Sequence, residues 1–370
     1  MHVLIDSLNW GGAETLLAEY AVGAERAGID VSVSHLADRP GAHHRLRDLG
    51  IEPVLIPVSG LVSRSGRRRV REHLAAVNPD LLHTHLGHSD VYGGLAARSL
   101  EIPAVATLHT MAEPRGLKER AKERLMGLAR RHCDARVIAV SDAARDAYLA
   151  RGWDTPSRVV TVRNGIIGEV RPGAGEKVRS GLGVSGDALL VGMVSVLRAG
   201  KGHDIAARAV MTLREEFPEL KLLVLGTGPD REEITRRLEP LGESVVMAGH
   251  RDDVLDVIDA MDVLIHPSLI DALPTALIEA MAASTPVVAT AVGGIPEIVA
   301  PGKTGALIGA PPTSAELAGA LRPLLADPDL RRRLGEAGRA RFDAEFTVDR
   351  WMERLLPVYR AAIAEAGARR

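Results

Sequence analysis

The chain has 370 residues, more than a single hydrophobic core usually spans, so we expect two domains. Hydrophobic residues make up 46% of it but aromatic residues only 3%, which favours an α/β fold of Val- and Ile-rich parallel strands covered by Ala- and Leu-rich helices. The 46 basic and 48 acidic residues nearly cancel, so no global field attracts nucleic acid.

The sequence also limits the compartment and the kinds of site. A single cysteine, Cys133, excludes a disulfide framework and a cysteine-based zinc site. The first apolar strand is expected from residue 2, without a basic leader, and no stretch of about 18 apolar residues follows. We therefore expect a cytoplasmic protein with no membrane span.

The first predicted unit is a strand followed by a helix, with glycines at the turn. Residues 2–6 form a short apolar strand, and helical apolar spacing runs over 13–26 after Gly11 and Gly12. The two glycines let the backbone approach a ligand and direct amides at an anion, although a plain tight turn is the alternative. The GxGxxG spacing is absent, which disfavours a nicotinamide cofactor.

The same alternation of strand and helix repeats through the first half. It predicts a doubly wound domain with a parallel sheet. The expected strands cover residues 31–34, 54–56, 81–83, 104–108, 137–140 and 159–162.

Several of these strands end in histidines. His109 follows one strand directly, so we expect it at the ligand-facing edge as a general acid or base or a hydroxyl ligand, with a structural hydrogen bond as the alternative. The spacing of His83, His85 and His88 argues against a metal site, because only His83 and His85 share one face of an extended strand.

Two stretches are basic, residues 64–71 and 115–136. The second also has apolar residues at helical spacing, namely Leu117, Ala121, Leu125 and Leu128. Such a helix can lie on anionic lipid or hold an acidic acceptor. The alternative is an ordinary amphipathic helix whose cations pair with Glu119 and Glu123.

Periodicity lapses between residues 164 and 187, where glycine recurs, and we place the interdomain connection there. A strand over 189–196 follows, and Arg198 and Lys201 then precede a helix. Two cations beside a helix N-terminus suit a diphosphate, whereas two solvated loop cations are the alternative.

Two more units of strand, loop and helix follow. Residues 221–225 precede Gly226, and residues 245–248 precede His250 and Arg251. These loops should line the same sheet edge as Arg198, where they can hold a nucleotide base and ribose.

Residues 262–297 are the most informative stretch. A strand over 263–265 ends shortly before Asp271, and Glu279 lies eight positions later inside the next helix. A second strand over 287–289 ends in glycines, and ligands bind outside the carboxyl ends of parallel strands. The alternative is that Asp271 caps the helix and Glu279 is a solvated helix residue.

Taken together, these features resemble family 4 of the retaining glycosyltransferases, which have the GT-B architecture of two facing Rossmann-like domains. The likeness spans nearly the whole chain. The segments that carry it are GGAE (11–14), VIAVSDAARDAYL (137–149), VRNGI (162–166), RAGKGHD (198–204), VLGTGP (224–229), AGHRDDV (248–254), PSLIDALPTALIEAMAASTPVVAT (267–290) and GGIPEIV (293–299).

The resemblance implies three parts. An acceptor-binding domain would cover 1–166, a nucleotide-sugar-binding domain 167–347, and a last amphipathic helix, 348–370, would pack back on the first domain. The implied activity is transfer, with retention, of a hexosyl unit from a UDP, GDP or ADP sugar to a hydroxyl of a glycan, a lipid-linked sugar or a small molecule, without a metal or other cofactor.

The resemblance also implies roles for residues. Asp271 would bind the transferred sugar, Glu279 the ribose, and Arg198 and Lys201 the diphosphate. His109 would face the donor sugar. Further donor-site positions are Gly11, Gly12, Gly226, His250, Arg251, Leu273, Thr275 and Ala276.

Three departures from the family pattern concern sugar binding. Asp271 and Ala272 stand where the family usually has glutamate and glycine. Val196 stands where the family usually has an arginine. Ile167 follows the Asn-Gly-Ile motif, after which the family often has aspartate. Two alternatives remain: a nucleotide-sugar 2-epimerase of the same architecture, and a catalytically silent sugar-nucleotide-binding protein, which Asp271 and Val196 suggest. As partners we expect the donor and acceptor, peripheral contact of segment 115–136 with the inner membrane face, and no nucleic acid.

Overall fold

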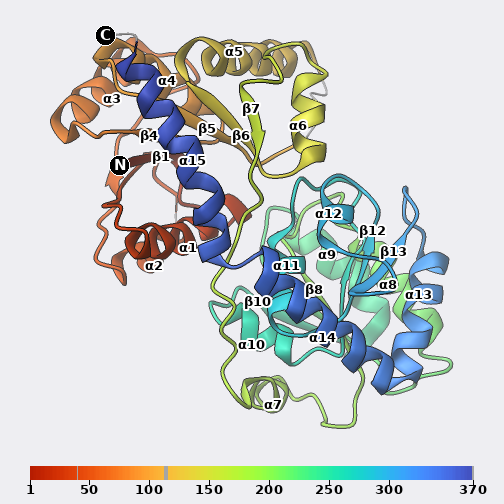
Figure 1. The fold of residues 1–370 in the computed structure, drawn as a ribbon. Helices are drawn as coiled ribbons and strands as arrows, with labels where there is room; N and C mark the ends of the chain where they lie inside the picture. The colour runs from red at the N-terminus through yellow and green to blue at the C-terminus, as the bar shows by residue number, and fades with distance from the viewer. Residues whose placement is uncertain (40, 112–115, 369–370) are drawn as a thin grey trace. The chain divides into compact units, whose positions relative to one another are not determined.

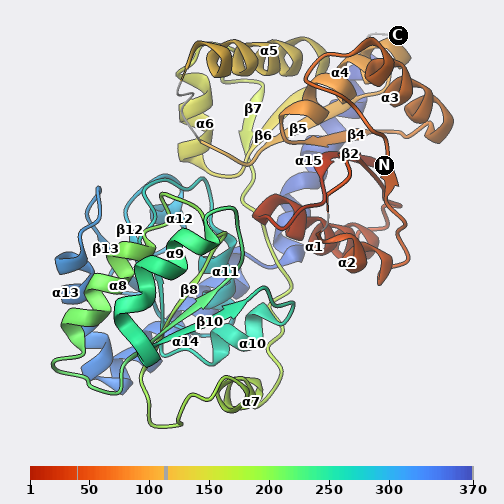
Figure 2. The ribbon, with the colours of Figure 1, turned by 180° about the vertical axis from the view of Figure 1, so that it is seen from behind.

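The computed structural model describes residues 1–39, 41–111 and 116–368. The chain divides into two compact units, which Figures 1 and 2 show from opposite sides. Unit 1 comprises Met1–Gly165 and Val348–Arg370, and unit 2 comprises Ile166–Thr347. Each unit is built on one all-parallel sheet, which confirms the α/β class.

Unit 1 has a seven-stranded sheet in the order β3-β2-β1-β4-β5-β6-β7. Strands are added outward on one side of β1 up to β3 and then on its other side from β4, so the strand order reverses between β1 and β4. The strands are β1 His2–Ser7, β2 Ser32–Ala37, β3 Val54–Leu55, β4 Leu82–His85, β5 Ala104–Leu108, β6 Arg136–Ala139 and β7 Val159–Thr161. The helices are α1 Gly12–Arg26, α2 His43–Arg47, α3 Arg64–Val77, α4 Gly87–Leu100, α5 Leu117–Cys133, α6 Asp142–Leu149 and α15 Val348–Gly367.

The last helix, α15, belongs to unit 1 although it follows unit 2 in the chain. It packs against α1 and buries Trp351, Leu355 and Tyr359. The hydroxyl of Tyr359 donates to that of Tyr20 at 3.1 Å and lies 2.9 Å from Nδ1 of His83, in the core. The carboxyl-terminal helix therefore completes the amino-terminal core.

Unit 2 has a six-stranded sheet in the order β10-β9-β8-β11-β12-β13, with its reversal between β8 and β11. The strands are β8 Leu190–Val194, β9 Lys221–Leu225, β10 Val245–Gly249, β11 Val263–His266, β12 Val287–Thr290 and β13 Gly305–Ile308. The helices are α7 Ala174–Gly181, α8 His203–Leu213, α9 Arg231–Leu238, the 3₁₀ segment η1 Glu239–Ser244, α10 Val254–Asp259, α11 Thr275–Ala282, α12 Ile295–Ile298, α13 Ser314–Ala326 and α14 Pro328–Glu345.

Residues 164–187 were expected to form the interdomain connection, but most of them belong to unit 2. The segment contains α7, which packs against α10 within unit 2, and Arg179 of α7 donates to Asp262 at 2.7 Å. Gly173 and Gly183, both with positive φ, lie on either side of this short helix. The glycines thus mark helix ends, and the division between the units lies earlier, at residue 165.

None of the helices in the described part of the chain is long and apolar enough to cross a membrane.

Candidate functional site

The switch point of the unit 2 sheet carries the first part of the site. β8 and β11 lie side by side there, and the loops that leave their carboxyl ends contain Lys201 and Asp271. In doubly wound sheets a crevice for ligands opens where the strand order reverses. Lys201 and Asp271 therefore come from the two loops best placed to bind one.

Lys201, Asp271 and His266 form one compact cluster. Nζ of Lys201 donates to Oδ2 of Asp271 at 2.6 Å, and Nε2 of His266 lies 2.8 Å from the same oxygen. Lys201 is 9% exposed and His266 4%. The cluster is thus a mostly buried ion pair with a histidine as its third member.

The partners of Asp271 decide its protonation. Burial acts to raise the pKa of this carboxyl group, but the hydrogen bond and charge of His266 and the charge of Lys201 outweigh it and hold the pKa well below its ordinary value. Asp271 is therefore a carboxylate at neutral pH, able to accept hydrogen bonds but not to donate a proton.

Glycines allow the loops at this edge to approach one another closely. Gly202 has φ +80°, and a Cβ there would lie 2.1 Å from the carbonyl oxygen of Pro267. A Cβ at Gly226 would lie 2.0 Å from the carbonyl oxygen of Ser195. Both positions require glycine, so the backbone geometry that places Lys201 beside Asp271 is fixed by sequence.

The other cationic residues expected at the donor site of unit 2 do not join the cluster of Lys201, Asp271 and His266. Arg198 is exposed and pairs with no described residue, so it does not join Lys201. Arg251 donates to Asp253 at 2.6 Å, and His250 lies 3.6 Å from Asp252. Arg251 and His250 therefore each lie beside a neighbouring carboxylate.

The start of helix α11 excludes the alternative in which Asp271 caps this helix. Its N-cap is Pro274, without a side-chain cap, so Asp271 does not cap it. Thr275 and Ala276 are its first residues, Leu273 is buried just before them, and Glu279 is half-buried one turn later. Asp271 is thus held by Lys201 and His266 instead of by helix amides.

At the carboxyl edge of the parallel sheet of unit 1, His109 follows β5. Its Nε2 lies 2.8 Å from Nδ1 of His85, and burial lowers the pKa of His109 to about 4, so the ring is neutral at pH 7. The rings of His83 and His85 lie 4.1 Å apart, which confirms that they share a face, whereas His88 pairs with Asp6 at 3.0 Å. Among the described residues no group of three or more His, Cys, Asp or Glu is placed to hold a metal.

The glycine pair expected at the first turn lies at the start of α1. Gly11 is the N-cap of this helix and Gly12 its first residue. Glu14 packs against Gly11, and burial raises the pKa of the Glu14 carboxyl group to about 7. A carboxyl group that titrates near neutrality therefore lies beside the glycine turn.

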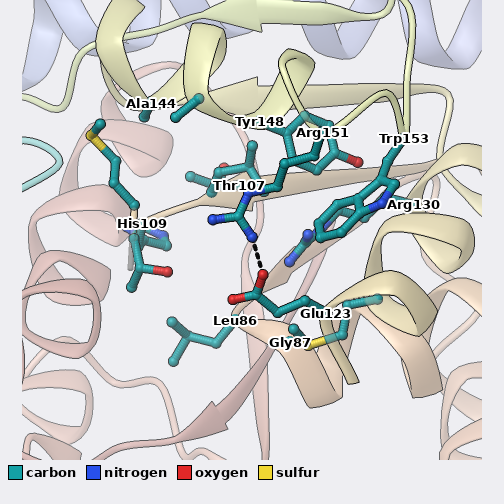
Figure 3. A pocket seen from close by; sticks show the side chains of 15 residues that line it. Leu86, Gly87, Thr107, His109, Glu123, Arg130, Ala144, Tyr148, Arg151 and Trp153 are labelled. Atoms are coloured by element: carbon teal, nitrogen blue, oxygen red, sulfur yellow. Dashed lines mark hydrogen bonds and ion pairs between the residues drawn. The ribbon is translucent and has the colours of Figure 1, made fainter. Parts of the chain in front are cut away.

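A pocket of about 110 Å³ opens beside His109, between the end of β5 and helices α5 and α6 (Figure 3). An ion pair joins Arg151 and Glu123 across it. The guanidinium carbon of Arg151 lies 5.3 Å from the ring centroid of Trp153. The remaining lining residues are Leu86, Gly87, Thr107, Leu108, Thr110, Met111, Met126, Arg130, Ala144, Ala147 and Tyr148.

Sequence reasoning missed several of these residues. His266 carried a usable signal, because it ends β11 only five residues before Asp271 and the rule for strand ends applies to both. Glu123 and Arg151 carried none, since they are 28 residues apart, on α5 and just after α6. The structure also places Glu123 against Arg151, so the expectation that it pairs with cations of its own helix is wrong.

Comparison with known proteins defines the class of protein to which this fold belongs. The chain superposes on the crystal structure of Anabaena Alr3699/HepE in complex with UDP-glucose with a TM-score of 0.86. The match covers 98% of this chain and 100% of the Anabaena chain, at 24% sequence identity. That likeness establishes the GT-B fold.

Sequence similarity establishes the family. Residues 10–167 match Glycosyltransferase Family 4 and residues 176–341 match Glycosyl transferases group 1. Alpha-maltose-1-phosphate synthase of Mycolicibacterium smegmatis is 32% identical over 77% of this chain and 79% of its own length. D-inositol 3-phosphate glycosyltransferase of Actinosynnema mirum is 28% identical over 94% and 92%.

The chain belongs to glycosyltransferase family 4, the glycosyl transferases group 1. It is a retaining hexosyltransferase that moves a sugar from a nucleotide-diphosphate sugar to an acceptor, as the sequence resemblance implied.

Proposed function

We propose that this protein transfers a glucosyl unit from UDP-glucose, that unit 2 binds this donor and that unit 1 binds the acceptor. The observation that carries the donor assignment is the buried cluster of Lys201, Asp271 and His266 at the switch point of unit 2. The structurally similar Anabaena protein was solved with UDP-glucose, which supports UDP-glucose as the first donor to test.

The donor-binding roles follow from charge. Lys201 is a compact cation that a diphosphate can engage, with Arg198 as an exposed second cation and the amides of Thr275 and Ala276 at the start of α11 as further donors. Asp271, ionised and rich in acceptor capacity, binds hydroxyls of the transferred sugar. Glu279, one turn into α11, binds the ribose.

Other residues complete the proposed donor site. The loops at Gly226, His250 and Arg251 lie beside the base, and Leu273 supplies apolar contact. The family resemblance also assigns His109 and the Gly11 and Gly12 turn of unit 1 to the donor sugar. His109 is neutral, so it can exchange hydrogen bonds with a sugar hydroxyl without adding charge.

The proposed mechanism follows from the charge that develops in the reaction. Cleavage of the anomeric C–O bond leaves a diphosphate and an oxocarbenium-like sugar, so cations fixed at the diphosphate lower the barrier most. Retention requires the acceptor to attack on the face that the diphosphate leaves. The departing phosphate oxygen then takes the proton of the acceptor hydroxyl.

We further propose that α5 contacts an anionic membrane surface peripherally. Its apolar stripe faces solvent instead of the core, with Leu117 85%, Leu125 38% and Leu128 40% exposed. Five exposed cations surround the stripe, namely Lys118, Arg120, Lys122, Arg124 and Arg131. An exposed apolar stripe bordered by cations suits a lipid interface. Arg115, the first residue of the basic segment, lies outside the described residues.

Binding and product analysis test the donor assignment. Calorimetry with UDP-, GDP- and ADP-glucose should give the tightest binding for UDP-glucose. Lys201→Ala should weaken it by roughly tenfold to a hundredfold, as the loss of a charge-assisted hydrogen bond predicts, while Lys177→Ala, an exposed lysine on α7, should not. Equal affinity in wild type and Lys201→Ala would exclude the proposed site, and an inverted anomeric product in NMR would exclude the front-side route.

A further inference from the structure

We propose that the pocket lined by Glu123, Arg151 and His109 binds an uncharged polyhydroxylated acceptor, a sugar or a polyol, and discriminates against its phosphomonoesters. This inference rests on the proposed function, because it assigns the acceptor class of the same reaction. The observation that carries it is that, among the described residues, the two cations that line the pocket are each matched by a carboxylate.

The first cation is compensated inside the protein. The guanidinium of Arg130, 8% exposed, pairs with the fully buried Asp90, with Nη2 2.6 Å and Nε 2.8 Å from Oδ2. Breaking a buried ion pair strands a charge and costs several kcal/mol. Arg130 therefore remains with Asp90 and offers an incoming anion no net attraction.

The second cation is compensated within the pocket itself. Arg151 donates to Oε2 of Glu123, and their side chains are 23% and 21% exposed. The ring of Trp153 lies beside the guanidinium of Arg151, and α5 supports that ring, because a Cβ at Gly127 would lie 2.7 Å from it. The pair is therefore held in place (Figure 3).

His109, which also lines the pocket, adds no charge. Burial lowers the pKa of His109 to about 4, so its ring is neutral at pH 7. A phosphomonoester would bring almost two negative charges into a pocket where each lining cation already has a carboxylate partner. A neutral ligand brings none.

The same pair is suited to hydroxyl groups. Oε1 of Glu123 accepts no hydrogen bond from a described residue, so it can accept one from a ligand hydroxyl while guanidinium N–H groups donate to the neighbouring hydroxyl. The hydroxyl of Tyr148 is buried beside the Arg130 guanidinium and meets no hydrogen bond of good geometry. Burial raises the pKa of this phenol to about 12, so it stays a donor.

The size and the apolar lining agree with one ring. A cavity needs roughly 10–15 Å³ to hold a single water, so a pocket of about 110 Å³ accommodates several waters or one small ring. Leu86, Met126 and Ala144 line it with apolar groups, which suit the C–H faces of a sugar or polyol. The acceptor hydroxyl that reacts would lie at the His109 end.

The test compares matched pairs of acceptors with a donor that the enzyme uses. Glucose and glucose 6-phosphate, and myo-inositol and its 3-phosphate, differ by one phosphoryl group. We expect kcat/KM for the neutral member to exceed that for its phosphomonoester at least about tenfold. Preference for the phosphomonoesters, or no transfer to any neutral member while the donor still binds, would overturn the inference.

A charge-removing variant separates this inference from the proposed function. Glu123→Gln removes the carboxylate that compensates Arg151. The ratio of kcat/KM for the neutral acceptor to kcat/KM for its phosphomonoester should therefore fall by about tenfold, while the affinity for the donor stays unchanged. Glu119→Gln, on the exposed side of the same helix, is the matched control and should leave the ratio unchanged. An unchanged ratio in Glu123→Gln contradicts the acceptor inference alone, whereas loss of donor binding in wild type contradicts the proposed function itself.

Discussion

A single carboxylate oxygen, Oδ2 of Asp271, is held by two nitrogens, Nζ of Lys201 and Nε2 of His266. In the proposed donor site, a diphosphate that engages Lys201 would leave His266 to keep the Asp271 carboxylate ionised and oriented toward the sugar. We therefore propose His266 as a positioning residue that acts on the sugar through Asp271.

His266→Ala should therefore change the pH dependence of donor hydrolysis. Without His266 the pKa of Asp271 rises, so Asp271 becomes protonated at a higher pH and the acid limb of kcat/KM moves toward neutrality. At neutral pH we expect a loss of about tenfold. His266→Asn, which can still donate a hydrogen bond, should recover part of the activity. A profile identical to wild type between pH 4 and 8 would contradict this role.

Glu14 makes the stability of unit 1 depend on pH. Burial, with a further contribution from Asp6, raises the pKa of its carboxyl group to about 7. The folded state then binds the proton more tightly than the unfolded chain, so stability is full below the unfolded pKa of about 4.3 and is lost as pH rises to about 7.

Glu14→Gln should remove this loss. Urea unfolding should show the variant more stable than wild type by about 3–4 kcal/mol at pH 8 and similar to it at pH 4, near the unfolded pKa. Glu25→Gln, an exposed residue of the same helix, should follow wild type at both values. A constant difference across the pH range would show that burial of Glu14 does not shift its titration.

Helix α5 presents two different faces. One packs Gly127, Ala129 and Arg130 against unit 1, and the other exposes Leu117 and Leu125. An exposed leucine costs free energy in water unless another surface covers it, and the surrounding cations favour an anionic one.

Leu125→Glu should therefore weaken binding to vesicles that contain phosphatidylglycerol, by removing apolar area and adding repulsion. In sedimentation assays, wild-type binding should decrease with salt and should be absent with phosphatidylcholine alone. Met211→Glu, a similarly exposed apolar residue on α8, is the control. If both variants bind as wild type does, α5 is not the contact surface.

How well the elements can be predicted depends on the signal that each one carries. The buried strands were predictable, because unbroken apolar runs such as 222–225 and 263–265 have few other uses in an α/β chain. Helix α7 was not, because short glycine-bounded helices have the composition of a linker. The periodicity of α5 was visible, but periodicity alone does not tell which face a protein buries.

The candidate site shows the same division. Lys201 and Asp271 could be paired from the sequence, because both follow strands that a parallel sheet brings to one edge. Arg198 was expected beside them, yet a long side chain in a loop is not fixed by strand order, and the structure leaves it exposed. Glu123 and Arg151 meet only because α5 and the end of α6 approach each other, which no local pattern encodes.

The two compact units are joined by two crossings of the backbone, at residues 165–166 and 347–348. Unit 1 contains both ends of the chain, so its stability depends on α15 being in place, whereas unit 2 is continuous. Trp351 of α15 is 4% exposed, and its ring lies 5.6 Å from that of Tyr20. Damage at this contact should therefore affect unit 1 and leave unit 2 intact.

Calorimetric unfolding should resolve this difference. Trp351→Ala opens a cavity worth about 3–5 kcal/mol, which should lower the unit 1 transition by roughly 10 °C, while Ile363→Ala on the exposed side of α15 should change little. UDP at about a hundred times its Kd adds about 2.7 kcal/mol to the unit that binds it, so it should raise only the unit 2 transition. If Trp351→Ala and UDP both shift one common transition, the two units unfold together, and the donor site depends on α15 for its stability.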